Sequence, residues 1–482
     1  MKKFIGLAIG FIALFGFAAS AFAIHAEIPS ETQAVVAKGT VQITISGDLR
    51  VRGWLKKNIA SANEDTVVGT LKTNQITDGQ NETYYDERVR LAVDASDGGV
   101  SGRIHLESNG GNHDVYTWGA PGQEGSNPAT ASDFNAKPAN MNILEAWIQY
   151  TGTGLFGVGS GIKVGHMPLA LGPDTLFFDH TKFGDDAIVG WVDPTPQTHI
   201  VALTIKAAES DPGGNFFGNG TSNAGDLDVY VGLVNQVLAG QNLQAYYVYA
   251  NSPEYYANAG AGFPHLSVQD LGLNASGSFS GLTYKAEYDQ NLGNFTKDGP
   301  LNKVETKGYA LQLNLGYKLG PAGIRVMGAY GSGPKANQTD LNQFVNFLSA
   351  NQYNTVVYGY QVANAMDDTN GNGDFFNQIS NTEMLNLGVD LNPTADLKVA
   401  LDYYYLRASK TENFTNVNNG VLGDVSHDIG SEFDVQADYA VAKNLDYFVK
   451  AGALVAGSFY SDTGFGQKKT AVVAMHGLEL AF

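Results

Sequence analysis

The chain has 482 residues, with 29 lysines and arginines against 48 aspartates and glutamates, 58 glycines and no cysteine. The lack of cysteine excludes disulfides, thiolate metal sites and thiol nucleophiles, which leaves histidine and carboxylates as metal ligands. The formal net charge of -19 argues against nucleic acid as a partner, because phosphate binding depends on clustered basic residues.

The beginning of the chain predicts an export signal. Lys2 and Lys3 precede an apolar run over residues 4–17, and Ala21-Phe22-Ala23 has the small residues of a cleavage site. Removing the two lysines leaves 27 basic and 48 acidic residues, a difference of -21. No later apolar run approaches the roughly 18 residues of a spanning helix. We predict a signal peptide over residues 1–23 and a periplasmic N-terminal segment over residues 24–39.

From residue 40 onward, apolar and polar residues alternate along the chain. Between residues 40 and 57 most odd positions are Val, Ile or Leu and most even positions are polar, and residues 309–317 and 384–391 repeat the pattern. A period of two is typical of strands with one apolar and one polar face. About 18 such segments are centred near residues 48, 89, 104, 147, 165, 188, 203, 232, 247, 271, 286, 311, 328, 387, 402, 435, 451 and 476.

The connections between these segments alternate between long and short. A long stretch over 58–81 is followed by a short one at 97–99, and a long stretch over 410–427 by a short one at 442–444. Bacterial outer-membrane barrels have short periplasmic turns and long external loops. The sequence therefore predicts an all-β, transmembrane, antiparallel up-and-down β-barrel over residues 40–482, with about 18 strands or 16 as the alternative, in the bacterial outer membrane. A secreted β-rich adhesin or solenoid is the competing interpretation.

The final segment has apolar residues at alternate positions and ends at Phe482. A last strand that ends in Phe resembles the signal read by the outer-membrane barrel assembly machinery. Aromatic clusters at 84–85, 246–249 and 403–405 lie near predicted strand ends, where they would form interfacial girdles or be ordinary strand residues.

Three stretches of the chain resemble alginate-export-type porins. They are residues 430–439 followed by Lys443-Asn444-Leu445, residues 163–172 followed by 182–184, and residues 47–52 with 88–91. The resemblance implies an 18-stranded channel in the general group of bacterial outer-membrane porins. It does not identify a solute.

Charged residues on the polar strand faces are predicted to line the lumen. Five of the seven arginines form a predicted basic wall on the first three strands: Arg50, Arg52, Arg88, Arg90 and Arg103. The predicted acidic pore-lining residues are Asp48, Asp86, Glu107, Glu145, Asp390, Asp402, Glu432, Asp434 and Asp438. Two interpretations stay open. Either basic and acidic walls set up a field across a constriction, or the arginines pair with acids of their own wall and fill the interior.

The longest connection, a predicted extracellular loop over residues 334–380, carries two signals. Leu341, Phe344, Val345 and Leu348 have helical spacing behind the N-cap Asp340, which predicts a short amphipathic helix that either closes the mouth or packs on other loops. Further on, a possible calcium site has oxygen ligands at alternate positions and ends without the usual Glu. Its residues are Asp368, Asn370, Asn372 and Asp374.

No catalytic set is recognisable among the nine histidines, and the glycine-rich stretch 213–225 opens no predicted helix, so an enzyme is not predicted. The sequence favours a channel for passive or facilitated passage of small hydrophilic solutes or ions. Two alternatives remain: a barrel that encloses a partner, such as a multihaem cytochrome or a polysaccharide export assembly, and a loop-based receptor or adhesin. Expected partners are outer-membrane lipid, the assembly machinery and small solutes. The oligomeric state is not predicted.

Overall fold

The structure is a computed structural model that describes residues 34–38, 40–60, 67–68, 71–72, 75–109, 116–117, 140–155, 157–181, 184–208, 227–252, 265–296, 303–335, 340–346, 355–359 and 379–482. The predicted signal peptide and the predicted calcium loop lie outside the described residues.

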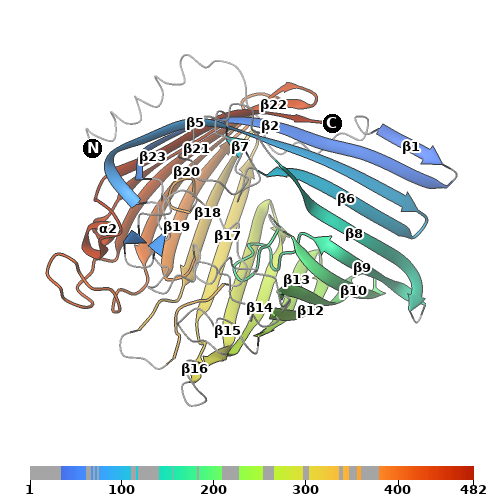
Figure 1. The fold of residues 1–482 in the computed structure, drawn as a ribbon, viewed down its shortest axis with the longest axis horizontal. Helices are drawn as coiled ribbons and strands as arrows, with labels where there is room; N and C mark the ends of the chain where they lie inside the picture. Colours follow the sequence, from blue (N-terminus) through green and yellow to red (C-terminus); the bar gives the residue numbers. More distant parts are fainter. Residues whose placement is uncertain are drawn as a thin grey trace.

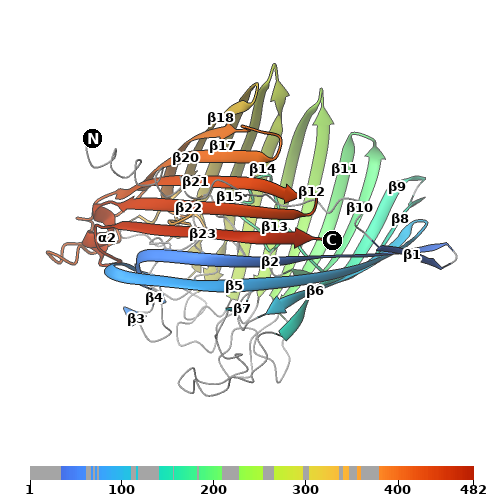
Figure 2. The same ribbon diagram turned by 90° about the horizontal axis from the view of Figure 1, so that it is seen from above.

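Eighteen strands form one closed antiparallel ring (Figures 1 and 2). In ring order they are β2 (Val41–Ala60), β5 (Gln75–Asp97), β6 (Val100–Asn109), β8 (Asn140–Leu155), β9 (Val158–Met167), β10 (Asp185–Thr195), β11 (Thr198–Ala208), β12 (Leu227–Leu238), β13 (Gln241–Ser252), β14 (His265–Phe279), β15 (Leu282–Thr296), β17 (Tyr309–Leu319), β18 (Ala322–Gly331), β19 (Thr382–Leu391), β20 (Leu397–Ala408), β21 (Asp428–Ala442), β22 (Leu445–Ala456) and β23 (Thr470–Ala481). The prediction of 18 strands is confirmed, and the alternative of 16 is wrong.

The first and last strands of the ring pair with each other and close the barrel. Register runs from Asp48 opposite Ala481 to Lys57 opposite Val472, and Gly47 and Phe482 exchange two backbone hydrogen bonds beyond it. The first residues of β2, 41–45, lie beyond the pairing with β23 and pair instead with β1 (Ala34–Lys38). Part of the predicted periplasmic segment is therefore a strand that continues the sheet past the end of β23.

Short turns and long connections lie at opposite ends of the barrel. The end with the C-terminus and β1 has the tight turns, and the other end carries α2 (Ser458–Thr463), β3 (Val67–Val68) and β4 (Leu71–Lys72) (Figure 2). Two of the tight turns have both central residues at positive φ: Ala239-Gly240 at 51° and 78°, and Ser280-Gly281 at 49° and 85°. Such turns match the twist of paired strands, which explains why glycine follows a small residue there.

Side chains alternate between the outer and the inner face of the ring. On β17, Leu311 and Leu313 are 40% and 42% exposed on the outside, whereas Gln312 between them is 4% exposed. The predicted aromatic clusters split in the same way: Tyr247 and Tyr405 point outward, while Tyr246 and Tyr404 are buried inside. An apolar outer face and a polar inner face are what a barrel in lipid requires.

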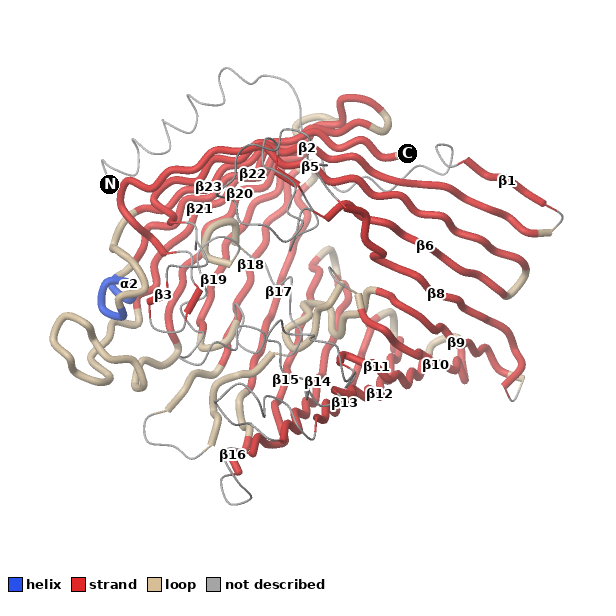
Figure 3. The backbone as a smooth tube through the Cα atoms, viewed as in Figure 1, coloured by secondary structure: helices blue, strands red, loops and turns tan. Residues whose placement is uncertain are grey.

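Helix is scarce in the described part of the chain, where α2 is the blue segment of Figure 3. None of the described helices has the length and apolar character needed to cross a membrane. The remaining short strands are β7 (Tyr116–Thr117), which pairs with β5, and β16 (Lys303–Glu305), which pairs with β15.

The predicted helix after Asp340 is wrong over its described part. Residues 340–346 form no helix: they have bends at residues 340 and 343, and Leu341 forms a parallel bridge with Thr306. Phe344 and Val345 are completely buried. Their spacing reflects burial inside the barrel and not a helical face.

We expect Leu313→Arg to destabilise the barrel by about 2–4 kcal/mol, because it places a charge on the outer face near the middle of β17. Leu319→Arg is the matched control on the same face of the same strand. Leu319 adjoins the tight turn, where the cost is about 0–1 kcal/mol. Urea unfolding in lipid vesicles measures both. Equal losses of stability in the two variants would show that the cost of a charge on this strand face does not depend on its depth in the membrane.

Candidate functional site

The arginines of the predicted basic wall form a ladder of ion pairs with acids of β2, β5 and β23. Arg52 binds Asp86 through Nε and Nη2, both at 2.8 Å, and the indole of Trp54 donates to the same carboxylate at 2.7 Å. Arg88 lies 2.7 Å from Asp48 and 3.1 Å from Glu479. Arg50 lies in register with Glu479 and Arg88.

The ladder continues onto β6 and β8. Arg90 forms an ion pair with Glu107. Arg103 lies 3.2 Å from Glu145 and 3.4 Å from Asp94, and the Glu145 carboxylate also contacts Nδ1 of His105 at 2.9 Å. The structure thus brings the predicted arginines together with acids of the same wall, which is the arrangement that the structural-network interpretation expects.

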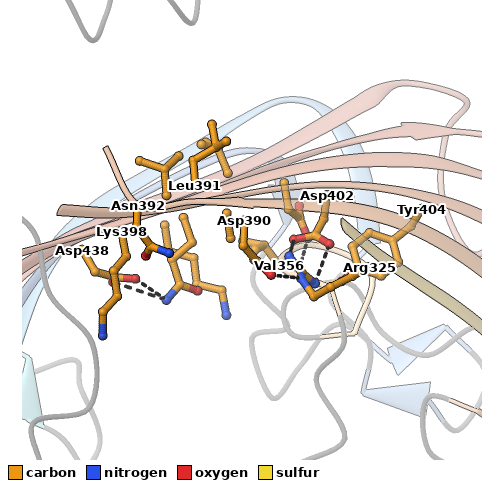
Figure 4. A pocket seen from close by; sticks show the side chains of 15 residues that line it. Arg325, Val356, Asp390, Leu391, Asn392, Lys398, Asp402, Tyr404 and Asp438 are labelled. Carbon is orange, nitrogen blue, oxygen red and sulfur yellow. Dashed lines mark hydrogen bonds and ion pairs between the residues drawn. The ribbon is translucent and has the colours of Figure 1, made fainter. Parts of the chain in front are cut away.

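The predicted acidic residues on β19 and β20 share one cation that the sequence analysis did not single out. Arg325 on β18 lies 2.8 Å from Asp390 and holds both oxygens of Asp402 at 3.0 Å (Figure 4). Arg325, Gly388 and Asp402 stand in one row across three strands. A Cβ at Gly388 would lie 2.5 Å from the Asp402 carboxylate and 2.8 Å from the guanidinium carbon. Gly388 therefore leaves the space through which Arg325 reaches β20.

The other predicted acids, on β21, have a different role. Glu432 accepts backbone N–H groups of Val357 and Tyr358 at 2.5 and 2.9 Å, and Asp434 accepts that of Val356 at 3.0 Å. These contacts hold residues 355–359 against the inner wall. Burial raises the pKa of the Tyr358 hydroxyl, which contacts Thr382 Oγ1 at 3.1 Å. Asp438 lies further along β21 and takes no part in this attachment.

A second segment, residues 168–181, reaches across the lumen. It begins after β9 as a small hairpin with Ala170 bridged to Asp179, and its tip arrives at β15, five strands further round the ring than β10. There Glu287 accepts the backbone N–H groups of Asp174 and Leu176 at 2.7 and 3.0 Å. Gly172, at φ 77°, has no room for a Cβ, which would lie 2.2 Å from Glu287.

The third segment, residues 340–346, is attached beside the second. Asn291 on β15 accepts the backbone N–H of Val345 at 2.7 Å and donates to its carbonyl at 2.9 Å. Asn346 donates to the carbonyl of Leu176 at 3.2 Å and so links the two segments. We call residues 168–181, 340–346 and 355–359 the three inner segments. Each is bonded to inward side chains and so occupies part of the lumen, and we call the part of the lumen beside them the constriction.

Sequence analysis missed the acidic cluster beneath the second and third inner segments. Asp270, Glu287 and Asp289 are at most 2% exposed on the inner faces of β14 and β15, and the Tyr246 hydroxyl donates to Asp289. The alternation of Lys285, Glu287, Asp289 and Asn291 on one strand face was a visible signal of a charged inner wall. Their task of holding loop backbone was not visible, because the contacts join residues more than 50 positions apart.

The proposed calcium ligands Asp368, Asn370, Asn372 and Asp374 lie outside the described residues, so the structure does not test them. Within the described ranges, no group of three or more His, Asp or Glu side chains is arranged to hold a metal ion.

Comparison with solved structures defines the class of fold as a porin-type outer-membrane β-barrel. OccK11 (OpdR) of Pseudomonas aeruginosa matches with a TM-score of 0.50 at 11% identity over 91% of this chain and 96% of that chain. OccK8 (OprE) of the same organism matches with a TM-score of 0.50 at 12% identity over 91% of this chain and 98% of that chain. At these identities the likeness concerns the fold alone.

The family model described as alginate export matches residues 216–474, more than half of the chain. The chain belongs to the alginate export family. None of the curated proteins compared with it matches.

We expect Arg325→Met to make the lumen more selective for cations, because Asp390 and Asp402 lose the guanidinium that neutralises them. The reversal potential under a salt gradient measures this shift, which should be largest at low salt, where screening is weakest. Arg407→Met is the control: it removes the same charge where Arg407 pairs with Glu383, next to the long connection after β20. If both variants shift the potential equally, Arg325 has no special influence on the pore.

Proposed function

We propose that this chain is a channel for passive passage of small hydrophilic solutes across the bacterial outer membrane. The observation that carries the proposal is the closed 18-stranded ring whose polar interior is narrowed by its own backbone. A ring of this size is wide enough for an aqueous channel. The three inner segments set the width of the pathway between its walls.

The charges of the walls support small solutes over polyanions. The described luminal contacts pair Arg52, Arg88, Arg90 and Arg103 with carboxylates, and Arg325 with two of them. Basic groups compensated in this way leave little excess positive charge to draw in a long polyanion. We propose that the arginine wall is mainly a structural ladder, with selectivity set at the constriction.

The outer surface supports a location in lipid. Apolar residues alternate outward along β17 and along β19 from Leu385 onward, including Leu311, Leu385 and Leu387 at 40–51% exposure. The tight turns would lie in the periplasm and the long connections outside the cell. Insertion by the barrel assembly machinery is part of the same proposal.

Single-channel recording in planar bilayers tests the proposal. We expect steady conductance steps in salt solution, with an ion preference that depends on salt concentration, and a conductance that falls as added neutral solutes become small enough to enter. Correctly folded protein that inserts but never conducts would refute a channel.

Glu432→Ala is expected to raise the single-channel conductance. It removes the acceptor of two buried backbone N–H groups, each worth about 1–3 kcal/mol when left unpaired, so residues 355–359 would leave the wall. Glu383→Ala is the control: Glu383 pairs with Arg407 and holds none of the three inner segments by a described contact. Parental conductance in Glu432→Ala, with normal insertion, would mean that this segment does not limit the pathway.

Export of a polysaccharide is the second candidate, and the family match favours it. It predicts that oligomers of a uronic acid block the ion current from one side at low concentration, whereas neutral oligosaccharides of equal length do not. A barrel that encloses a partner protein is less well supported, because the three inner segments occupy part of the lumen.

A further inference from the structure

A cavity of about 450 Å³ lies on the inner wall of β18 to β22, near the tight-turn end and beside Val356 of the inner segment 355–359. Its size is within the range of small-molecule sites. In Figure 4, Arg325, Lys398 and Asp438 lie on one side of the sheet, and Leu391 points to the other side. The cavity is therefore luminal and lies next to the constriction.

One end of this cavity is positive. Lys398 on β20 stands opposite Asp438 on β21, and Lys450 on β22 stands opposite Gln436, so the two lysines flank Asp438 on both sides. Gln436 already donates to both oxygens of Asp438, at 3.0 and 3.3 Å. Within the described part of the chain, neither lysine has a hydrogen bond or an ion pair. Among the residues that line the cavity, two ammonium groups against one carboxylate leave a surplus of one positive charge, with the Asp446 carboxylate outside the lining.

The other end is negative. Asp390 and Asp402 share the single guanidinium of Arg325, and Asp434 adds a third carboxylate. Asp434 accepts the Val356 N–H through Oδ2, while its Oδ1 is buried without a hydrogen-bond partner among the described residues. Because one Asp434 oxygen is bonded to Val356 and the other is buried, only Asp390 and Asp402 present charge to a solute, and against one guanidinium they leave a surplus of one negative charge. Asp390 on β19 pairs with Ala400 on β20, two residues from Lys398, so Lys398 and Asp390 are diagonal neighbours with Cα atoms about 7–8 Å apart.

We propose that this cavity is a binding subsite for a small zwitterion, a solute with one anionic and one ammonium group. The anionic group would lie between Lys398 and Lys450, and the ammonium group would face Asp390 and Asp402. The inference rests on the proposed channel function and names a solute class for it.

The charge pattern separates a zwitterion from simpler solutes. A simple anion is attracted by the two lysines but repelled by the carboxylates at the other end. A simple cation is attracted by the carboxylates but repelled by the lysines. A dipolar solute satisfies both ends at once without changing the net charge of the lumen. Because the walls of the cavity have a low dielectric constant, the two ends act strongly at short range.

Alanine and lactamide, which are isomers of equal size, test the proposal. Alanine is a zwitterion at pH 7 and lactamide is neutral. We expect liposomes containing the full-length protein to take up alanine faster than lactamide in swelling measurements. In the double variant Lys398→Gln with Lys450→Gln, the ratio of the two rates should fall by about threefold or more, which is within the effect of a charged cleft on local solute concentration.

The control double variant is Lys318→Gln with Lys443→Gln. It removes two exposed lysines at the same end of the barrel, Lys318 at the end of β17 and Lys443 in the turn after β21, both outside the cavity, and should keep the parental ratio. A parental protein without preference for alanine, an unchanged ratio in the cavity variant, or an equal fall in the control would each overturn the subsite. If neither solute enters and no conductance is seen, the channel itself fails. Uptake of both at equal rates rejects only the subsite.

Discussion

Backbone that enters the lumen of a barrel must find hydrogen-bond partners there, and this constraint organises the interior of the protein. The strand ladder already uses most backbone groups of the wall, so inward side chains serve as partners beside a few backbone bonds such as that from Phe344 to Ser332. Glu287, Asn291 and Glu432 take this role, each bonding two backbone groups of a segment that is distant in sequence. Carboxylates suit the task because their two oxygens accept two N–H groups at once.

The same constraint explains where glycine stands on the inner wall. Gly172 lets the inner segment 168–181 approach Glu287. Gly452 on β22 faces the inner segment 355–359, where a Cβ would lie 2.7 Å from the side chain of Val356 and 3.0 Å from that of Val357. Gly388 makes the equivalent room for Arg325. A larger residue at any of these positions would push the attached group away from the wall. The position of the inner segments thus depends on these glycines as well as on the charged side chains.

The fold was predictable because its signals are local. Alternation over a few residues identifies a strand, and tight turns with glycine separate one strand from the next, so the centres of all 18 strands fell inside observed strands. The site was predictable only in part. Arg52 and Asp86 were found because each lies on a polar strand face, but the row of Arg325, Gly388 and Asp402 requires the register of three strands. The apolar spacing after Asp340 was misread, since burial of Phe344 and Val345 inside a barrel produces the same pattern as a helical face.

The closing pair of β2 and β23 has a consequence for the route by which the protein folds. Every other pair in the ring joins strands that follow one another along the chain, whereas this pair joins segments more than 400 residues apart. Contact order is therefore low for seventeen pairings and extreme for one. Bringing the two ends of the chain together lowers the chain entropy, and this cost precedes the hydrogen bonds of the closing pair. The ion pair between Arg88 and Glu479, 391 residues apart, spans this junction and forms only after the two end strands have paired. Ring closure is the slow and final step of assembly, and until then two strand edges remain open.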